Sequence, residues 1–599
     1  MRLINNESLT LDLFMGSVPQ YAILSHTWED GEVTFEDYTN PELSVRSQKR
    51  GFGKIQRMCD LAKRAGLKYS WVDTCCIDKR SSAELTEAIN SMFQWYKDAV
   101  VCFAWLADLP TEQSSHSRPS TQRPLISGLE SCRWFTRGWT LQELIAPRRV
   151  EFYDQQWHFR GTKADISDQL VRITNISDDV LRNPASVCRL SVAQRMAWAA
   201  RRQTTRAEDI AYCLLGIFDV NMPMMYGEGA RAFIRLQEAI AAQCNDFSLF
   251  AWKASPNESQ QMYRGVFAMS PSEFGDSNAI RLMRNAVFNP EFLITNKGLR
   301  MNTSIFAGQD GAYFLGLNCA NSQTSEGSTE EVGIWIQQHG GGVYSRIRSE
   351  EYASLPQGQA AKLGRIFLSR VVSLELSREL EGSQDHAFVF RNGFNEANIA
   401  TYAPKFPFEV IQFFPSEQWD SQRRMFVTHG AGDFAAYGHF MPRFGFDDFQ
   451  TTELSSGESF ILTFGRTLGE LQPWVCIASA KDDLEIFQAQ GDARKVATAA
   501  RPKRNNRTVL LRDDYQWISK AVHVSLEPVT TEGRVVYYID LHYIDAPELQ
   551  LIGPHGALSH PESYSYKKRY GLGKKAIRRT SSSHSLGDSW LTKGYLEDE

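Results

Sequence analysis

The chain has 599 residues, of which 42% are hydrophobic and 23% are charged. One hydrophobic core rarely grows beyond roughly 250–300 residues, so we expect several domains, and the apolar content argues against wholesale disorder. The formal net charge is −5, yet the segment 567–579 contains basic residues and no acidic one. The rest of the chain is therefore acidic, and we expect no nucleic-acid-binding surface on it.

The ten cysteines are scattered and form no CxxC pair, which argues against a disulfide scaffold and against a zinc module. We therefore expect no metal site. The N-terminus lacks the basic and apolar regions of a secretory signal. The longest apolar run, Ala99–Ala107, is far shorter than the ~20 residues that span a bilayer. These features predict a cytoplasmic protein without a membrane anchor.

Apolar runs and helical periodicities alternate over the first 160 residues. The predicted strands are Tyr21–Ser25, Tyr69–Ile77, Val100–Leu106 and Val150–Tyr153. The predicted helices are Lys54–Ala65, a helix with a capping box at Ser81–Glu84, and Trp139–Ile145. This alternation favours a parallel sheet covered on both faces. Because ligands on such sheets bind at the carboxyl ends of the strands, the loops after Ser25, Ile77 and Leu106 are candidate binding loops.

The remainder divides into three regions. Residues 191–242 read as mainly helical, with a second capping box at Thr205–Glu208. Beyond about residue 250, short β patterns are typical of one or two antiparallel sandwiches. These patterns are Tyr313–Asn318, Val332–Gln337, Arg365–Leu376, Ala387–Arg391, Phe408–Phe414, Ser459–Gly465, Trp474–Ala478 and Val535–Tyr543. The Ser-, Lys- and Gly-rich terminus is predicted to be disordered; its basic run is either a nuclear-localisation segment or a solvated tail.

Three stretches of the first region could carry chemistry. Ser25, His26 and Trp28 follow the first strand and offer a hydroxyl, an imidazole and a stacking ring, or form an ordinary polar turn. Asp73 interrupts the second predicted strand, and a buried carboxylate needs a defined partner, which is more often structural than catalytic. Cys75 and Cys76 beside it are expected in the core.

The third stretch is Arg133–Leu144, in which two tryptophans and two arginines precede Glu143. Leu141, Leu144 and Ile145 occupy the buried face of the predicted helix. Glu143 then lies at the edge of that face, where a cleft could hold it; the alternative is an ordinary exposed glutamate.

Three blocks of this region strongly resemble the signature blocks of the fungal heterokaryon-incompatibility (HET) family, in the same order and spacing. They are YAILSHTWEDGEVTFEDY, the stretch from GFGKIQRMCD to CFAWLAD, and CRWFTRGWTLQELIAPRRVEFYD. The stretch from RAEDIAYCLLG to LQEAI is similar to the helical segment that follows this block in many HET proteins. The resemblance covers about residues 20–245 and implies a role in self/non-self recognition and programmed cell death.

HET domains are in turn similar to Toll/interleukin-1-receptor (TIR) domains, and WTLQEL resembles the TIR pattern W-C-L-[D/N]-E-L, departing from it at Thr140 and Gln142. The resemblance implies a TIR-like, flavodoxin-like α/β fold. It divides the chain into a HET domain at 1–165, a helical extension at 166–248, a β-rich region at 249–550 and a disordered basic tail at 551–599.

Many TIR domains cleave NAD with the glutamate of this pattern, so the resemblance makes Glu143 the candidate catalytic residue. NAD would be a substrate and no resident cofactor is implied, because no GxGxxG fingerprint follows a strand. The candidate substrate-binding residues are Ser25, His26, Trp28, Asp73, Asp78, Arg133, Trp134 and Trp139. Arg133 or Arg137 could meet the pyrophosphate.

Two functions remain open. In the first, the HET domain self-associates and cleaves NAD. In the second, it is a non-catalytic signalling module that acts through partners. Self-association and an upstream recognition protein are the expected interactions.

Overall fold

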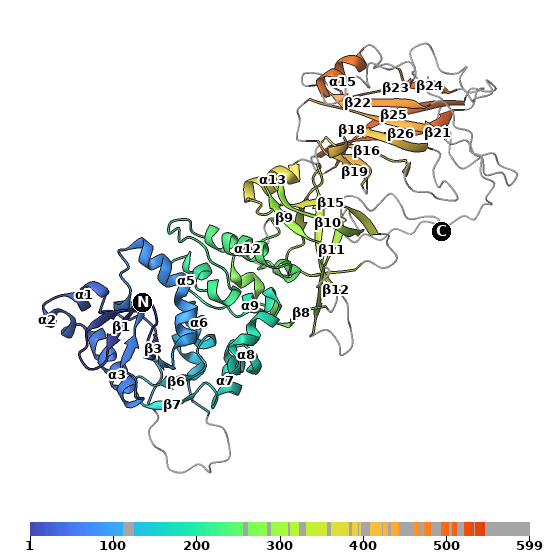
Figure 1. Ribbon diagram of the computed structural model, residues 1–599. Coiled ribbons are helices and arrows are strands. Elements are labelled where there is room, and N and C mark those ends of the chain that lie inside the picture. The colour runs from blue at the N-terminus through green and yellow to red at the C-terminus, as the bar shows by residue number, and fades with distance from the viewer. Residues whose placement is uncertain are drawn as a thin grey trace.

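The computed structural model describes residues 1–111, 125–255, 261–283, 289–308, 312–322, 331–355, 361–382, 386–392, 394–396, 408–421, 423–428, 433–442, 459–467, 472–480, 493–501, 506–511, 520–531 and 534–544. The predicted disordered tail lies outside these residues. Figure 1 shows an α/β part at one end of an elongated molecule, a helical part and a first β part in the middle, and a second β part at the far end.

The α/β part contains a seven-stranded sheet in the order β2-β1-β4-β3-β5-β6-β7. The strands are β1 (Arg2–Asn5), β2 (Leu11–Leu13), β3 (Tyr21–His26), β4 (Tyr69–Trp71), β5 (Val101–Trp105), β6 (Val150–Tyr153) and β7 (Phe159–Thr162). The four central strands, β3 to β6, are parallel, and antiparallel pairings add the edge strands. This confirms the predicted parallel sheet, in which β3 is buried along its whole length.

The chain runs from β3 to β4 on one side and then returns to β5 on the other side of β3. The loops that leave β3 and β5 therefore diverge at the carboxyl edge of the sheet, and such switch points are where doubly wound sheets bind ligands. The candidate residues that follow β3 lie at this edge.

Helices of the α/β part connect and cover these strands. They are α1 (Phe35–Thr39), α2 (Leu43–Ser47), α3 (Arg50–Arg64), α4 (Asp73–Cys76), α5 (Ser82–Asp98) and α6 (Thr140–Ile145), with 3₁₀ turns η1 (Leu129–Ser131) and η2 (Arg133–Thr136). The Ser81 hydroxyl caps α5, accepting from the Glu84 N–H at 3.3 Å. The Glu84 carboxylate instead accepts from the Asp78 N–H at 3.0 Å, so only half of the predicted capping box forms.

The second predicted strand is shorter than the sequence indicated. β4 ends at Trp71, and residues 73–76 form the single turn α4. Asp73 therefore opens a helix instead of interrupting a strand, a position where the partial positive charge of the backbone N–H groups favours a carboxylate.

Helices and 3₁₀ turns follow the α/β part. The elements of this helical part are α7 (Ser167–Thr174), α8 (Asp178–Arg182), η3 (Pro184–Arg189), α9 (Val192–Ala197), α10 (Asp209–Tyr212), α11 (Leu215–Phe218), α12 (Arg231–Gln243) and η4 (Phe247–Phe250). The predicted capping box at Thr205–Glu208 does not form, because the Glu208 carboxylate accepts from the N–H groups of Gly227 and Gly229 at 2.7 and 3.0 Å. Gly216 brings α11 onto α5: a Cβ there would lie 2.1 Å from the Phe93 Cβ.

The first β part is a closed ring of strands, a β-barrel, and not a sandwich. It contains η6 (Pro271–Phe274), η7 (Ser277–Ala279), β8 (Ile280–Leu282), β9 (Phe292–Thr295), β10 (Gly298–Ala307), β11 (Ala312–Asn321), β12 (Glu331–Gln338), β13 (Val343–Ile347), β14 (Ala353–Ser354) and β15 (Ala361–Leu368). β10, β11, β12, β13 and β15 pair in turn, and β15 pairs back with β10. The predicted strand at Arg365–Leu376 stops at Leu368, and helix α13 (Leu374–Gly382) follows.

The second β part is a sandwich of two sheets, which is the architecture that the sequence predicted for the β-rich region. One sheet has the order β19-β20-β16-β26-β25-β24 and the other β17-β18-β21-β22-β23. The strands are β16 (Phe388–Phe390), β17 (Asn395–Glu396), β18 (Phe408–Phe414), β19 (Trp419–Asp420), β20 (Met425–Phe426), β21 (Phe434–Pro442), β22 (Phe460–Arg466), β23 (Trp474–Ser479), β24 (Thr508–Leu511), β25 (Lys520–Thr531) and β26 (Arg534–Ile544), with η9 (Ser416–Gln418) and α15 (Ala493–Ala500) beside them.

The sequence predicted an antiparallel β-rich region, and this prediction is wrong in part. Three strand pairs are parallel: β13–β15, β16–β26 and β17–β18. Alternation of side chains cannot distinguish the two pairings, since it has the same period in both.

Two large hydrophobic cores, beside three smaller clusters, organise the described residues. The first runs without interruption from Leu3 in the α/β part to Leu368 in the ring of strands. The second lies between the two sheets of the sandwich and is rich in phenylalanine. Among the described residues, no helix is both long and apolar enough to cross a membrane.

Candidate functional site

A buried carboxylate and a serine meet at the carboxyl edge of the parallel sheet. Ser25, near the end of β3, donates a hydrogen bond from its hydroxyl to Glu143 Oε2 on α6. Trp134 donates from its Nε1 to the same serine oxygen at 2.8 Å. Glu143 is only 6% exposed and Trp134 is fully buried. Trp134 therefore orients Ser25 and presents no free ring face to a ligand.

Burial makes the ionised form of Glu143 costly. It raises the pKa of Glu143 to about 7, and the nearby Asp73 carboxylate adds to the shift, whereas the hydrogen bond from Ser25 and the charge of Arg137 oppose it. The sequence placed Glu143 at the edge of the buried face; the structure places it inside. A carboxyl group with a pKa near neutrality is typical of functional sites.

A second group of candidate residues surrounds Asp73. The Trp28 Nε1 donates to Asp73 Oδ2 at 2.8 Å. His26 Nε2 lies 3.8 Å from Asp73 Oδ1 and 3.9 Å from Glu32 Oε1. Burial, together with the cationic side chains of Lys54, Lys79 and Arg137, lowers the pKa of His26 to about 3. His26 is therefore a neutral imidazole at physiological pH.

Asp73 remains ionised in this setting. Burial alone would raise the pKa of Asp73, but the neighbouring positive charges and the Trp28 hydrogen bond lower it. The structure thus brings Ser25, His26, Trp28, Asp73 and Glu143 together from β3, its following loop, α4 and α6.

The other predicted residues lie around this group. Arg133 pairs with Glu29 and Asp108, so its guanidinium is already occupied. The Trp139 Nε1 donates to Asp209 Oδ2 at 3.4 Å, which ties α6 to the helical part. Asp78 accepts from the Arg80 N–H at 3.1 Å and orders its own loop. Burial raises the pKa of the Cys75 thiol well above its usual range, as expected for a core cysteine.

Residues 21–123 match the family model described as "Heterokaryon incompatibility protein (HET)". The chain contains a HET domain. The matched range ends before Glu143, so the family model covers the Ser25 and Asp73 side of the site and not α6.

A curated relative extends the similarity. The chain is 46% identical over 235 residues to "Vegetative incompatibility protein HET-E-1" of Podospora anserina. These residues are 39% of this chain and 17% of the relative, so the chain spans only a small part of that protein's length. No solved structure matches the chain.

Sequence reasoning missed several residues that shape the HET-domain site. Lys79 Nζ lies 3.5 Å from the centroid of the Trp28 ring. The Tyr96 hydroxyl donates to the Leu24 carbonyl at 3.0 Å, beside the Ser25–Glu143 pair. Lys79 lies in the candidate binding loop after Ile77, whereas Tyr96 lies in a segment interpreted only as a helix, and neither spacing nor composition marks either residue as a neighbour of β3.

Arg202, which lies in the helical part, is another residue that sequence reasoning missed. It is buried, and its Nη1 donates to the Arg137 carbonyl at 2.8 Å and to Thr140 Oγ1 at 2.9 Å. Backbone hydrogen bonds join Gln203 to Thr136 and Gly138 at 2.7 and 2.8 Å. The extension therefore holds the turn that carries Arg137 into α6, and the HET-domain site depends on residues beyond 165.

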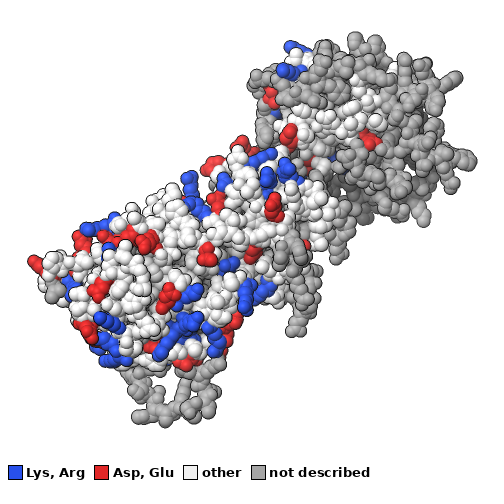
Figure 2. Space-filling view, in the orientation of Figure 1, with Lys and Arg blue, Asp and Glu red and all other residues white. Residues whose placement is uncertain are grey.

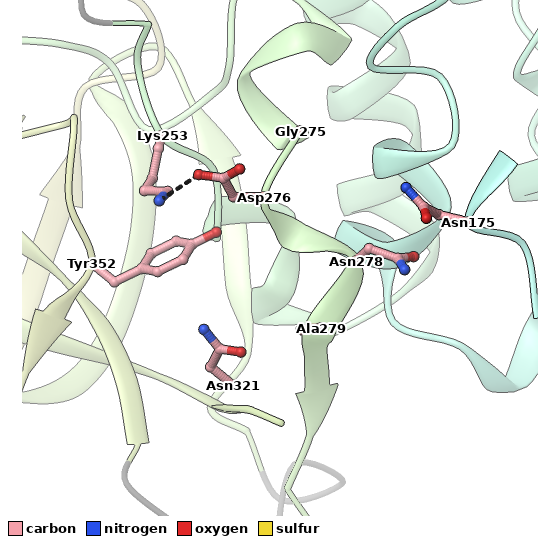
Figure 3. A pocket seen from close by; sticks show the side chains of 8 residues that line it. All are labelled: Asn175, Lys253, Gly275, Asp276, Asn278, Ala279, Asn321 and Tyr352. Carbon is pink, nitrogen blue, oxygen red and sulfur yellow. Dashed lines mark ion pairs between the residues drawn. The ribbon is translucent and has the colours of Figure 1, made fainter. Parts of the chain in front are cut away.

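A separate cavity of about 430 Å³ lies between the helical part and the ring of strands. Figure 3 shows the Lys253–Asp276 ion pair, at 2.6 Å, above Tyr352, with Asn175, Asn278 and Asn321 around the opening. None of its lining residues belongs to the Glu143 site.

On the face drawn in Figure 2, acidic and basic side chains are interspersed over the HET-domain end of the molecule.

Proposed function

We propose that this protein acts in heterokaryon incompatibility and that its HET domain cleaves NAD, with Glu143 as the catalytic carboxylate. The similarity to a protein named for vegetative incompatibility supports the biological role. The resemblance of WTLQEL to the TIR pattern supports the chemistry, as does the order of the parallel strands. The observation that carries the proposal is the buried Glu143 carboxyl group, held by Ser25 at the ligand-binding edge of the sheet.

The chemistry requires only one carboxylate. Nicotinamide leaves NAD as a neutral molecule, so the leaving group needs no proton and the paired carboxylates of ordinary glycosidases are unnecessary. Ionised Glu143 would stabilise the oxocarbenium-like charge that develops on the ribose as the bond to nicotinamide breaks. A water molecule would then add to the ribose carbon and lose a proton, which gives ADP-ribose. With a pKa of about 7, Glu143 is partly ionised at neutral pH. The Ser25 hydroxyl, itself fixed by Trp134, favours the ionised form and sets its orientation.

Access to Glu143 is the step that activation would control. At 6% exposure, the carboxyl group can be reached by a substrate only if the residues that cover it move. We therefore include self-association in the proposal: assembly of HET domains, triggered by an upstream recognition protein, opens the site. The protein would act in the cytoplasm, and the β-rich region would receive the activating signal.

Nicotinamide release from NAD tests this proposal. The full chain is assayed free and after clustering on a multivalent scaffold that binds an N-terminal tag. We expect release by the clustered wild type, loss of at least about a hundredfold in Glu143→Gln, and little change in Glu130→Gln, which alters an exposed glutamate on η1. No release by the clustered wild type, or equal release by Glu143→Gln, would contradict the proposal.

The closed state of the site favours one alternative, a non-catalytic TIR-like signalling module. In that case Glu143 has no catalytic role, and death follows from partners that bind the surface of the domain. Expression in cells separates the two: Glu143→Gln, which is nearly isosteric, stays toxic under the alternative, and substitutions in the Asp78–Ser82 loop abolish toxicity. Under the NAD-cleavage proposal, Glu143→Gln is harmless and intracellular NAD is preserved.

A further inference from the structure

Three side chains from separate loops converge on one exposed ring at the mouth of the HET-domain site. Trp28 follows β3 and is 42% exposed. Lys79, in the loop after α4, lies with its ammonium 3.5 Å from the centroid of the Trp28 ring. Arg137, in the turn before α6, has its guanidinium carbon 5.7 Å from the same centroid. Two cations thus flank an aromatic ring that solvent can reach.

Neither cation is neutralised by a direct partner. In the described part of the chain, no carboxylate lies within 4.0 Å of Lys79 Nζ or of the Arg137 guanidinium, and the buried Arg137 Nε makes no hydrogen bond. Lys54, by contrast, pairs directly with Glu32, and Arg133 pairs with Glu29 and Asp108. Lys79 is exposed and Arg137 is half-buried, so the Lys79 ammonium is free to pair with a ligand, and the buried Nε of Arg137 lacks a hydrogen-bond partner that a ligand could supply.

Glu143, whose charge interacts with that of Arg137, forms no ion pair with it, and neither cation forms one with Asp73. One of the Asp73 oxygens already accepts from Trp28, and its single charge faces both Lys79 and Arg137. His26 is neutral at physiological pH, so it adds no charge to this group. Two cations without ion-pair partners among the described residues thus lie beside a stacking surface, which suits a ligand with both a polyanion and a planar ring.

We propose that Lys79 and Arg137 bind the diphosphate of a nucleotide and that Trp28 stacks on its base. Phosphate oxygens would draw the Lys79 ammonium off the Trp28 face, which frees the ring for the base. The inference deepens the proposed function, on which it rests for the identity of NAD as substrate, because it assigns the residues that would hold the diphosphate. Arg133, the alternative considered from the sequence, is excluded from this role by its two carboxylate partners.

The test measures binding separately from cleavage. ADP-ribose, which keeps the diphosphate and the adenine of NAD but lacks nicotinamide, is titrated into the full chain by calorimetry. We expect Lys79→Met and Arg137→Met each to weaken binding by about tenfold or more, as the loss of one charge-assisted contact does. Trp28→Leu should weaken ADP-ribose binding but leave inorganic pyrophosphate binding unchanged. Arg133→Met is the matched control and should stay within about threefold of wild type.

Two further outcomes keep the inference falsifiable. Lys79→Arg keeps a cation at this position and should retain ADP-ribose binding, which separates loss of charge from loss of folding. ADP-ribose that fails to bind, or that binds wild type and both methionine variants equally, would overturn the inference. If ADP-ribose binds as expected while NAD is not cleaved, the diphosphate site stands and the catalytic proposal fails.

Discussion

At the scale of single residues, the Glu143 carboxyl group combines burial with a raised pKa. It is almost completely buried, it accepts from Ser25, and its pKa is raised to about 7 because burial penalises the charge. A group whose pKa is higher in the folded than in the unfolded state stabilises the fold at low pH, and this stability is lost as the pH rises through the folded pKa.

Glu143→Gln should therefore stabilise the chain in a pH-dependent way. At pH 8 the wild type holds a buried charge that glutamine lacks, and we expect the variant to be about 2–3 kcal/mol more stable to urea. The advantage should shrink as the pH falls from 7 towards 4.5, where the wild-type carboxyl group becomes protonated. Glu130→Gln should change stability little at either pH. An advantage of equal size at pH 5 and pH 8 would show that the charge of Glu143 is not the cause.

At the scale of elements, the helical part supports the site as much as the sheet does. Arg202 reaches from the segment after α9 to the turn before α6, where it donates to the Arg137 carbonyl and to Thr140. Because this guanidinium is buried, methionine can fill its volume but cannot replace its hydrogen bonds.

We expect Arg202→Met to lower the free energy of unfolding by about 1–3 kcal/mol and to weaken ADP-ribose binding by displacing Arg137. Equilibrium urea unfolding and calorimetric titration measure the two effects. The neighbouring Arg201→Met, on an exposed side chain, should do neither. If Arg202→Met leaves both quantities at wild-type values, the extension does not hold the site.

The same elements show what a sequence can predict. The parallel strands, α3 and α6 follow from apolar runs and helical periodicity, because burial on a sheet or along a helix face imposes those patterns. The placement of Lys79 over Trp28 and of Arg202 on Arg137 could not be predicted, since it depends on how loops from distant segments meet. The end of β4 at Trp71 was missed for a local reason: apolar residues flank Asp73 on both sides in the range 69–77, yet Asp73–Cys76 forms one helical turn.

At the scale of the whole molecule, two cores imply two folding units. One core joins the HET domain, the helical part and the ring of strands; the other lies within the sandwich. In the second core Phe388 is fully buried, with its ring centroid 5.3 Å from that of Phe434 and 5.2 Å from that of Phe464.

Scanning calorimetry of the full chain should therefore resolve two transitions. Phe388→Ala should destabilise the sandwich by about 3–5 kcal/mol and lower only one of them. Leu24→Ala, in the buried strand β3, should lower only the other. A single transition that both variants lower would mean that the two cores unfold as one unit.

The central claim, that ionised Glu143 performs the chemistry, is tested most directly by the pH dependence of nicotinamide release from the clustered full chain. We predict that the rate rises with pH and reaches half its maximum near pH 7, where the Glu143 carboxyl group loses its proton. Glu143→Gln should show no such rise. A wild-type rate that falls with pH over this range, or a Glu143→Gln profile that follows the wild type, would contradict the account.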